Sequence, residues 1–264
     1  MKNFVAVIIF LGFISGCSSS TESGEVGANR SQFLLLPSSY IENSAASGYQ
    51  KTIETARSKG QLDRNPSQVD RVRTVAKRLI PHTANFRAEA PRWDWQTHVI
   101  TSDEINAWCM PGGKIAFYSG IIEKLQLTDG EIAAIMGHEI AHALREHGRE
   151  RMSQELVKVL GIQILEQTGK INSETAEAAM IVSSLAISLP NSRGQESEAD
   201  RIGMELMARA GYNPNEAVTL WRKMQSAGGK KNLEFLSTHP SDSTRIENLE
   251  RLAPQLMHLY TKAR

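Results

Sequence analysis

The sequence predicts an α+β fold that is mostly helical, with a small sheet packed on one central helix. Residues 93–100 alternate apolar and polar side chains, and short strand-like segments at 107–110 and 114–118 flank the turn-forming Pro111-Gly112-Gly113. After Thr128 the chain shows only helical periodicity and loops, with helices that end near residue 160 and span about 174–189, 196–210, 214–226 and 243–263. Strands followed by a run of helices are typical of the α+β class.

Helical periodicity also precedes the strands, over residues 49–60 and 66–81, and Asn65-Pro66 marks the start of the second helix. The apolar run Ala178–Leu189 is too short to cross a bilayer and is interrupted by serines, so we predict a buried helix there. No internal repeat is visible. A chain of 264 residues is a suitable size for one domain with a single core.

The central helix is predicted to begin at Thr128. Thr128 as N-cap and Glu131 three residues later form a capping-box pattern, which satisfies the free N–H groups of a helix start. Ile132, Ile135 and Met136 then recur at helical spacing and give the helix an apolar side.

This helix carries the segment His138-Glu139-Ile140-Ala141-His142. Residues four apart lie one above the other on a helix, so His138 and His142 can direct two imidazoles at one metal ion. Glu139 can instead contact a water on that metal, which is the arrangement of a zinc hydrolase. The motif alone leaves a second interpretation open, because two histidines on a helix often form only a polar face.

A third ligand is expected on another helix, because catalytic zinc has three protein ligands and a water. Glu196 and Asp200 share one face of a helix that Gly211 would close, whereas Glu198 points away from them by about 160–200°. One residue of the pair can bind zinc while the other accepts a hydrogen bond from a ligand histidine. The alternative is a solvated acidic helix start, which the helix dipole favours.

Four ordered motifs resemble the zinc metallopeptidase family of HtpX, the CAAX prenyl proteases and the bacterial envelope proteases LoiP and BepA. They are H-E-I-A-H, E-S-E-A-D at 196–200, Thr238-His239-Pro240 with Arg245-Ile246, and the strand segment 105–120. The resemblance runs from about residue 65 to 252 and implies a zincin-like metalloprotease domain of the gluzincin type. It also implies one Zn²⁺ per chain held by His138, His142 and Glu196, with Asp200 hydrogen-bonded behind the ligands. Every motif residue is present.

The resemblance also places His239 near the active site, and in some relatives this histidine can occupy the open position of zinc as a reversible plug. Alternatively, His239 or Arg245 could donate a hydrogen bond to a developing oxyanion, or His239 could simply cap the last helix. Pro240 is expected to hold His239 in an extended loop. His147 lies five residues past His142, so we expect helical geometry to rotate it off the ligand face.

For substrate binding, the candidate is the strand Lys114, Ile115, Ala116, Phe117 and Tyr118, which the resemblance implies to be a sheet edge. An extended peptide can pair with an exposed edge through its backbone, which suits broad specificity. The alternative is that these residues form an ordinary central strand.

The N-terminus predicts a lipoprotein signal peptide at residues 1–16. Lys2 precedes the apolar run Phe4–Ile14, which is too short to span a bilayer, and Ile14-Ser15-Gly16-Cys17 resembles a bacterial lipobox. Cys17 would then carry the lipid (palmitate), residues 17–48 would form a flexible tether, and residues 49–264 the protease domain. An ordinary secretory signal with an incidental cysteine is the alternative. Cys109 would be a lone thiol, expected to be a small buried residue.

The function expected from these features is that of a zinc-dependent endopeptidase that degrades misfolded or unassembled proteins of the bacterial envelope. It would be held by its lipid at the periplasmic face of the outer membrane, with no other membrane contact. A net charge of +1 with interspersed charges gives no electrostatic basis for binding nucleic acid. The alternative is a chaperone-like factor that holds outer-membrane proteins, with zinc structural or latent. A purely structural site needs no Glu139, so that residue favours chemistry.

Overall fold

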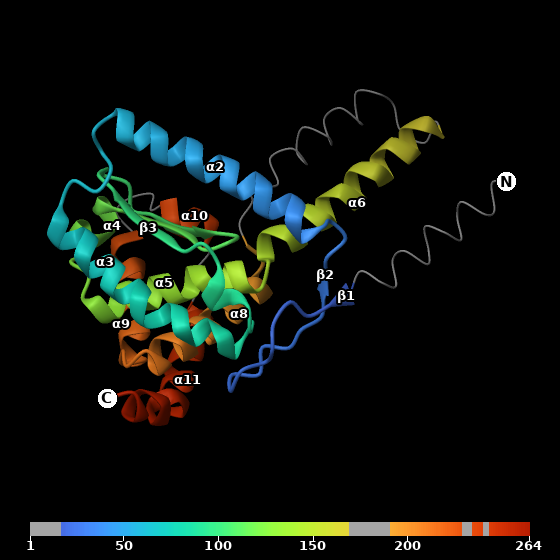
Figure 1. The fold of residues 1–264 in the computed structure, drawn as a ribbon. Coiled ribbons are helices and arrows are strands. Elements are labelled where there is room, and N and C mark those ends of the chain that lie inside the picture. The colour runs from blue at the N-terminus through green and yellow to red at the C-terminus, as the bar shows by residue number, and fades with distance from the viewer. Residues whose placement is uncertain (1–16, 169–190, 229–233, 240–242) are drawn as a thin grey trace.

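The computed structural model describes residues 17–168, 191–228, 234–239 and 243–264. The predicted signal peptide at 1–16, the predicted helix at 174–189 and Pro240 lie outside these described residues. Within them, the α+β architecture predicted from the sequence is confirmed: a small sheet lies among helices (Figure 1).

The sheet consists of β3 (Gln96–Ile100), β4 (Ala107–Met110) and β5 (Lys114–Tyr118). The strand order is β3-β5-β4, with β3 parallel and β4 antiparallel to β5. Between β4 and β5 the chain turns through Gly112 and Gly113, both at positive φ. A Cβ on Gly113 would lie 2.7 Å from the Trp95 ring, so this turn needs glycine.

The strand order corrects the prediction that Lys114–Tyr118 is a sheet edge. β5 is the central strand, and Ile115, Ala116 and Phe117 have no exposed surface. A strand that is covered on both faces carries a continuous apolar run, and β5 has that pattern. The edges of the sheet are β3 and β4.

Helices cover both faces of the sheet. On one face, α2 (Ser38–Ser58) packs Ala56 against Ala116 and Tyr49 edge-on against Trp108. On the other face lie α3 (Pro66–Leu79), which Asn65 caps, and α5 (Asp129–Leu144) (Figure 1). Two short 3-10 helices, η1 (Ile80–Asn85) and η2 (Ala90–Arg92), lead from α3 to β3, and α4 (Ser119–Lys124) follows β5.

The central helix α5 forms as predicted. Thr128 accepts a hydrogen bond from the Glu131 N–H, and the Glu131 carboxylate accepts one from the Thr128 N–H. Every residue from Gly130 to Leu144 is buried. Such a helix is enclosed on all sides, so its polar residues must find partners inside the protein.

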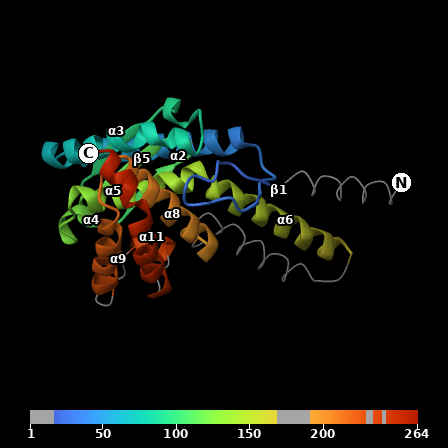
Figure 2. The ribbon, with the colours of Figure 1, turned by 90° about the horizontal axis from the view of Figure 1, so that it is seen from below.

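Helix α8 (Arg193–Arg209) packs across α5 (Figure 2). Ser192 and Gln195 form a second capping box at its start, and Gly211 closes it with φ +73°. A Cβ on Gly137 would lie 2.7 Å from the Gly203 carbonyl oxygen, and one on Gly203 would lie 2.7 Å from the His138 nitrogen. The two glycines therefore let the helix backbones touch beside His138.

Three helices complete the fold: α9 (Asn215–Gly228), α10 (Glu234–Thr238) and α11 (Ser243–Lys262). The sequence predicted α9 and α11 within a few residues but not the short α10. It also predicted one continuous helix past residue 144, whereas the chain breaks at Glu146, which is left-handed (φ 48°), before α6 (His147–Gln167). Among the described residues, no helix is both long enough and apolar enough to span a bilayer.

The predicted tether at residues 17–48 is wrong for the part of the chain that the structure describes. β1 (Cys17–Ser18) pairs with β2 (Gln32–Phe33), the intervening loop buries Val26 and Ala28, and α2 already begins at Ser38. The polar composition suggested a flexible segment, but the polar side chains are bound to the rest of the domain.

Candidate metal centre

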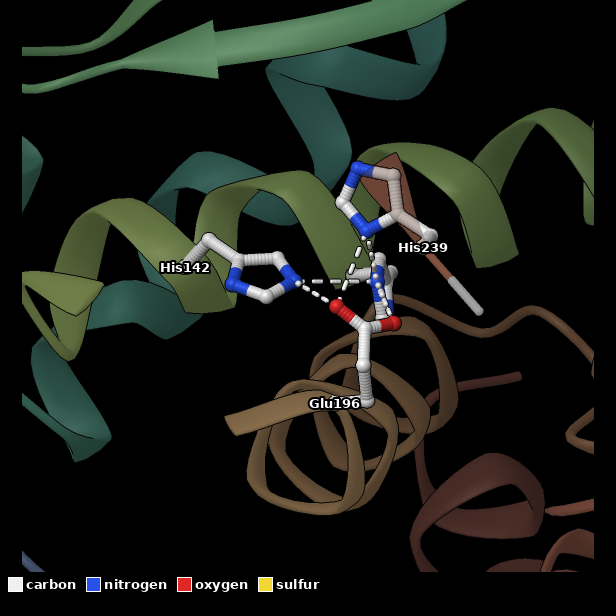
Figure 3. Close-up of side chains that lie close together, drawn as sticks. His142, Glu196 and His239 are labelled. Carbon is white, nitrogen blue, oxygen red and sulfur yellow. Dashed lines mark hydrogen bonds and ion pairs between the residues drawn. The ribbon is translucent and has the colours of Figure 1, made fainter. Parts of the chain in front are cut away.

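Two histidines of α5 and one glutamate of α8 meet where these helices cross. The Nε2 atoms of His138 and His142 lie 3.0 Å apart. Glu196 Oε2 lies 3.3 Å from the first nitrogen, and Glu196 Oε1 lies 3.3 Å from the second. Figure 3 shows the Glu196 carboxylate rising from α8 toward the His142 ring. The structure thus brings together the three residues predicted as metal ligands.

His239 joins this group from the opposite side. Its Nδ1 lies 3.1 Å from His138 Nε2 and 3.1 Å from Glu196 Oε1 (Figure 3). His239 follows the last turn of α10: its N–H donates to the Phe235 carbonyl, and its ring stacks on the Phe235 ring. His239 thus lies in a bend directly after α10, as predicted for a loop residue, but the last turn of α10 and the stacking on Phe235 hold it.

The donor set fits zinc. Tetrahedral zinc with metal–nitrogen bonds of about 2.0–2.1 Å places neighbouring ligand atoms about 3.3 Å apart. The ligand atoms of His138, His142, Glu196 and His239 converge, with all four within 4.8 Å of one another. Imidazole nitrogens whose lone pairs converge on one point at this spacing repel each other unless a cation or proton lies between them. The residues present therefore suit a bound Zn²⁺.

Burial and neighbouring charges shift the pKa of all three residues predicted as ligands. Burial lowers the pKa of His142 well below its usual value, which favours the neutral imidazole that binds metal. Burial opposes the charged form of His138 as well, but Glu196 and Asp200 outweigh it and raise the His138 pKa to about 9. Burial alone would raise the pKa of Glu196, but the nearby histidines outweigh burial and hold this pKa far below its usual range.

Glu139 lies beside this group without belonging to it. Its Oε1 is 3.4 Å from His239 Nε2 and accepts no hydrogen bond from the residues that the structure describes. Burial raises the pKa of this carboxyl, against the opposing influence of His239 and His138. A carboxyl with a raised pKa can both take a proton and return it.

Asp200 and Arg245 lie behind the ligands. His138 Nδ1 is 3.0 Å from Asp200 Oδ1, so the carboxylate orients the ring whose other nitrogen faces the metal position. Arg245 binds Asp200 through Nε and Nη2, each at 2.7 Å, and its Nη1 lies 2.8 Å from Glu196 Oε2. Its guanidinium also stacks over Trp221 at 3.4 Å.

These contacts correct the catalytic role considered for Arg245. Its guanidinium is bound to the two carboxylates and is buried, at 6% exposure. It is therefore placed to hold Glu196 and Asp200 in position, and not to donate to a substrate oxyanion. Glu198, in contrast, points away from the metal position as predicted.

Sequence reasoning missed one pair behind the predicted ligand His142, namely His147 and Glu198. As expected, His147 is not among the grouped ligands, but its Nδ1 lies 2.8 Å from His142 Nδ1 and its Nε2 lies 3.1 Å from Glu198 Oε2. Continuous helical geometry would have rotated His147 away. The break at Glu146 redirects the chain and turns His147 back toward His142, and the sequence carries no strong signal for that break.

Residues 66–253 match the model of peptidase family M48. The chain belongs to this family. The zincin-like fold and the zinc-dependent metalloendopeptidase class predicted from the sequence are thus confirmed for its M48 domain.

Several curated proteins resemble the M48 chain. It is 34% identical over 180 residues to the mitochondrial metalloendopeptidase OMA1 of Saccharomyces cerevisiae, covering 64% of this chain and 50% of that protein. The mitochondrial metalloendopeptidase OMA1 of Homo sapiens is 32% identical over 200 residues, covering 70% of this chain and 38% of that protein. The beta-barrel assembly-enhancing protease of Escherichia coli is 24% identical over 213 residues, covering 77% and 42%. The chain spans half or less of the length of these relatives.

Proposed function

We propose that this M48 chain is a zinc-dependent endopeptidase of the bacterial cell envelope that hydrolyses misfolded or unassembled envelope proteins. The observation that carries the enzymatic part is the position of Glu139. It lies next to the convergent ligand atoms and is buried, and its Oε1 accepts no hydrogen bond from the described residues. A structural metal site has no need for such a carboxylate.

The roles of the chain's residues follow from the geometry. His138, His142 and Glu196 would hold Zn²⁺, and Asp200 would orient His138. When bound, zinc supplies a Lewis acid that polarises a carbonyl group and acidifies water. Glu139 would take the proton of the attacking water and pass it to the leaving amine, acting as general base and then as general acid.

His239 is proposed to be a plug and not an oxyanion donor. Its Nδ1 occupies the fourth position of the convergent set, 3.1 Å from atoms of both His138 and Glu196. A catalytic zinc site keeps that position open for water or substrate. The described arrangement is therefore a closed state, and His239 has to move before a peptide can be cleaved.

Attachment through a lipid on Cys17 remains a proposal, as do the periplasmic face of the outer membrane and envelope proteins as substrates. A bacterial relative named for β-barrel assembly supports the envelope, while the mitochondrial relatives leave the specificity open. Because Ser18 pairs with Gln32 next to the domain, a lipid at Cys17 would hold the enzyme close to the membrane surface and not on a long tether.

One observation favours a second candidate function, that of a chaperone-like holding factor with latent zinc. The four grouped ligands form a closed set, as in a structural zinc site. The two functions differ in their dependence on Glu139, because holding needs the surface but not the general base.

Glu139→Gln tests the proposal, since it keeps the size of the side chain and removes its basicity. We expect the variant to bind zinc normally and to cleave an unfolded protein at less than about 1% of the wild-type rate. Comparative proteomics of envelopes that contain each protein would then show the substrates as accumulated or trapped species. Retained cleavage by Glu139→Gln would contradict the proposal, and full function in vivo without cleavage would favour holding.

A further inference from the structure

The N-terminal segment of residues 19–36, here called the strap, lies against the catalytic helix although it is outside the residues that match the family. The family match begins at residue 66. In Figure 1 the strap is the blue loop at β1 and β2, and α6 begins beside it. It contacts the corner between α5 and α6, which directly follows the ligand His142.

Hydrogen bonds fix the strap to this corner. Ser20 Oγ donates to the Leu144 carbonyl at 3.2 Å, and the Gln32 amide donates to the Arg145 carbonyl. Arg145 has no exposed surface and donates back to Ser19 Oγ at 2.9 Å and to the Arg30 carbonyl at 2.8 Å. These bonds satisfy backbone groups that the end of α5 leaves free.

Arg30 joins two helices through their carboxylates. It donates to both oxygens of Glu150 on α6, at 2.6 and 2.9 Å, and to both oxygens of Glu198 on α8, at 3.2 and 2.9 Å. Both carboxylates are buried, at 1% and 6% exposure. The planar fork of a guanidinium suits two such bidentate contacts, and an ammonium group cannot reproduce them.

A continuous path of contacts leads from Arg30 to the metal position. Glu198 Oε2 lies 3.1 Å from His147 Nε2, and His147 Nδ1 lies 2.8 Å from His142 Nδ1. Of the two nitrogens of His142, Nε2 faces Glu196 at 3.3 Å, and the other is held by this path. The partner of the second nitrogen sets the orientation of a ligand imidazole.

We propose that the strap is a working part of the metal centre, in which Arg30 is a positioning residue that fixes His142 through Glu198 and His147. The inference rests on the proposed function, because it takes His142 as a zinc ligand. Arg145 also contacts Glu198, at 3.0 Å, and Gln195 of α8 donates to Glu150 at 3.0 Å. Arg30 differs from both because it binds the Glu198 and the Glu150 carboxylates together, and so bridges α8 to α6, the helix that carries His147.

The test measures zinc release from the full chain, loaded with zinc, into a chromogenic chelator. Arg30→Gln removes the fork, and Arg30→Lys keeps the charge without it. Glu25→Gln is the matched control: Glu25 is an exposed strap residue that pairs with Arg209 and His258, away from His142. Circular dichroism at the assay temperature verifies that each variant is folded.

We expect Arg30→Gln to release zinc about 10–100-fold faster than wild type, the usual effect of losing a partner behind a ligand. Arg30→Lys should release zinc at a rate between those of wild type and Arg30→Gln, and Glu25→Gln should release it at the wild-type rate. If Arg30→Gln does not fold, Arg30→Lys carries the comparison, and release from it at the wild-type rate would overturn the proposal, as would wild-type release from folded Arg30→Gln.

A double-variant cycle separates positioning from general loosening of the fold. If Arg30 acts through His147, the double variant Arg30→Gln/His147→Ala releases zinc no faster than His147→Ala alone. Effects that multiply would contradict the proposed path. The failure of the proposed function looks different: Glu139→Gln would then still cleave an unfolded protein, whatever the zinc release rates of the Arg30 variants.

Discussion

Replacing Gly203 by alanine perturbs the crossing of α5 and α8 without changing any proposed ligand side chain. The new Cβ would lie 2.7 Å from the His138 nitrogen, where ordinary contact begins at 3.4 Å. The helix backbones would have to separate by roughly the difference, about 0.7 Å (3.4 − 2.7). Metal ligands tolerate displacements of only about 0.2 Å. Glu196 on α8 therefore could not reach zinc together with His138 and His142 on α5.

Two effects should be measurable in Gly203→Ala. Overpacking costs about 1–3 kcal/mol of unfolding free energy, partly offset by up to ~1 kcal/mol from the better helix propensity of alanine. At about 2–4 °C per kcal/mol, the melting temperature in the presence of a chelator should fall by a few degrees. Bound zinc should fall well below one ion per chain, measured by mass spectrometry of the metal after dialysis.

Gly194→Ala is the control in the same helix, because the nearest atom to its added Cβ is Ser192 Oγ at 3.9 Å. It should keep its zinc and lose no stability. If Gly203→Ala also kept one zinc per chain and its full stability, close backbone contact would not be what places Glu196, and the reasoning would be refuted.

Three further outcomes follow. His239→Ala should raise the rate at which an unfolded protein is cleaved. If His239 closes the site in most wild-type chains, the factor is about one divided by the fraction of chains that are open. A 10²–10³-fold fall in the rate would instead identify His239 as an oxyanion donor. Burial would raise the pKa of Glu198, but His147, Arg30 and other partners outweigh it and lower it to about 2. A depressed carboxyl pKa stabilises the fold above about pH 4.5, and this stability is lost as the pH falls toward 2. Glu198→Gln should therefore reduce the fall in unfolding free energy over this pH range, measured by denaturant titration. Burial raises the pKa of Cys109 well above its usual value, so its thiol should react with a disulfide reagent only on unfolding, and rapid reaction of the native protein would contradict this.

The parts of the site that could be predicted depend on local periodicity. The four-residue spacing of His138 and His142, and of Glu196 and Asp200, places each pair on one helix face whatever the rest of the fold does. The caps at Thr128 and Asn65 are equally local. For this reason the helix starts of the structure agree with the sequence prediction, and the three residues predicted as ligands lie close together.

The parts that could not be predicted depend on contacts between distant segments. The order of the strands is set by packing on both faces of the sheet, so β5 could not be distinguished from an edge strand by its composition. The strap is polar and short of periodic apolar residues, yet Arg30 contacts Glu198 on α8, 168 residues later. His147 reaches His142 because Glu146 adopts the left-handed conformation. Few non-glycine residues adopt this conformation, and no sequence pattern predicted it here.

The most direct test of the central claim is the zinc content of purified Glu196→Ala, compared with wild type and with Ser197→Ala, the exposed neighbour on α8. If His138, His142 and Glu196 hold the metal, wild type and Ser197→Ala should each carry one zinc per chain, and Glu196→Ala should lose most of it. Zinc retained by Glu196→Ala at the wild-type stoichiometry would contradict the account.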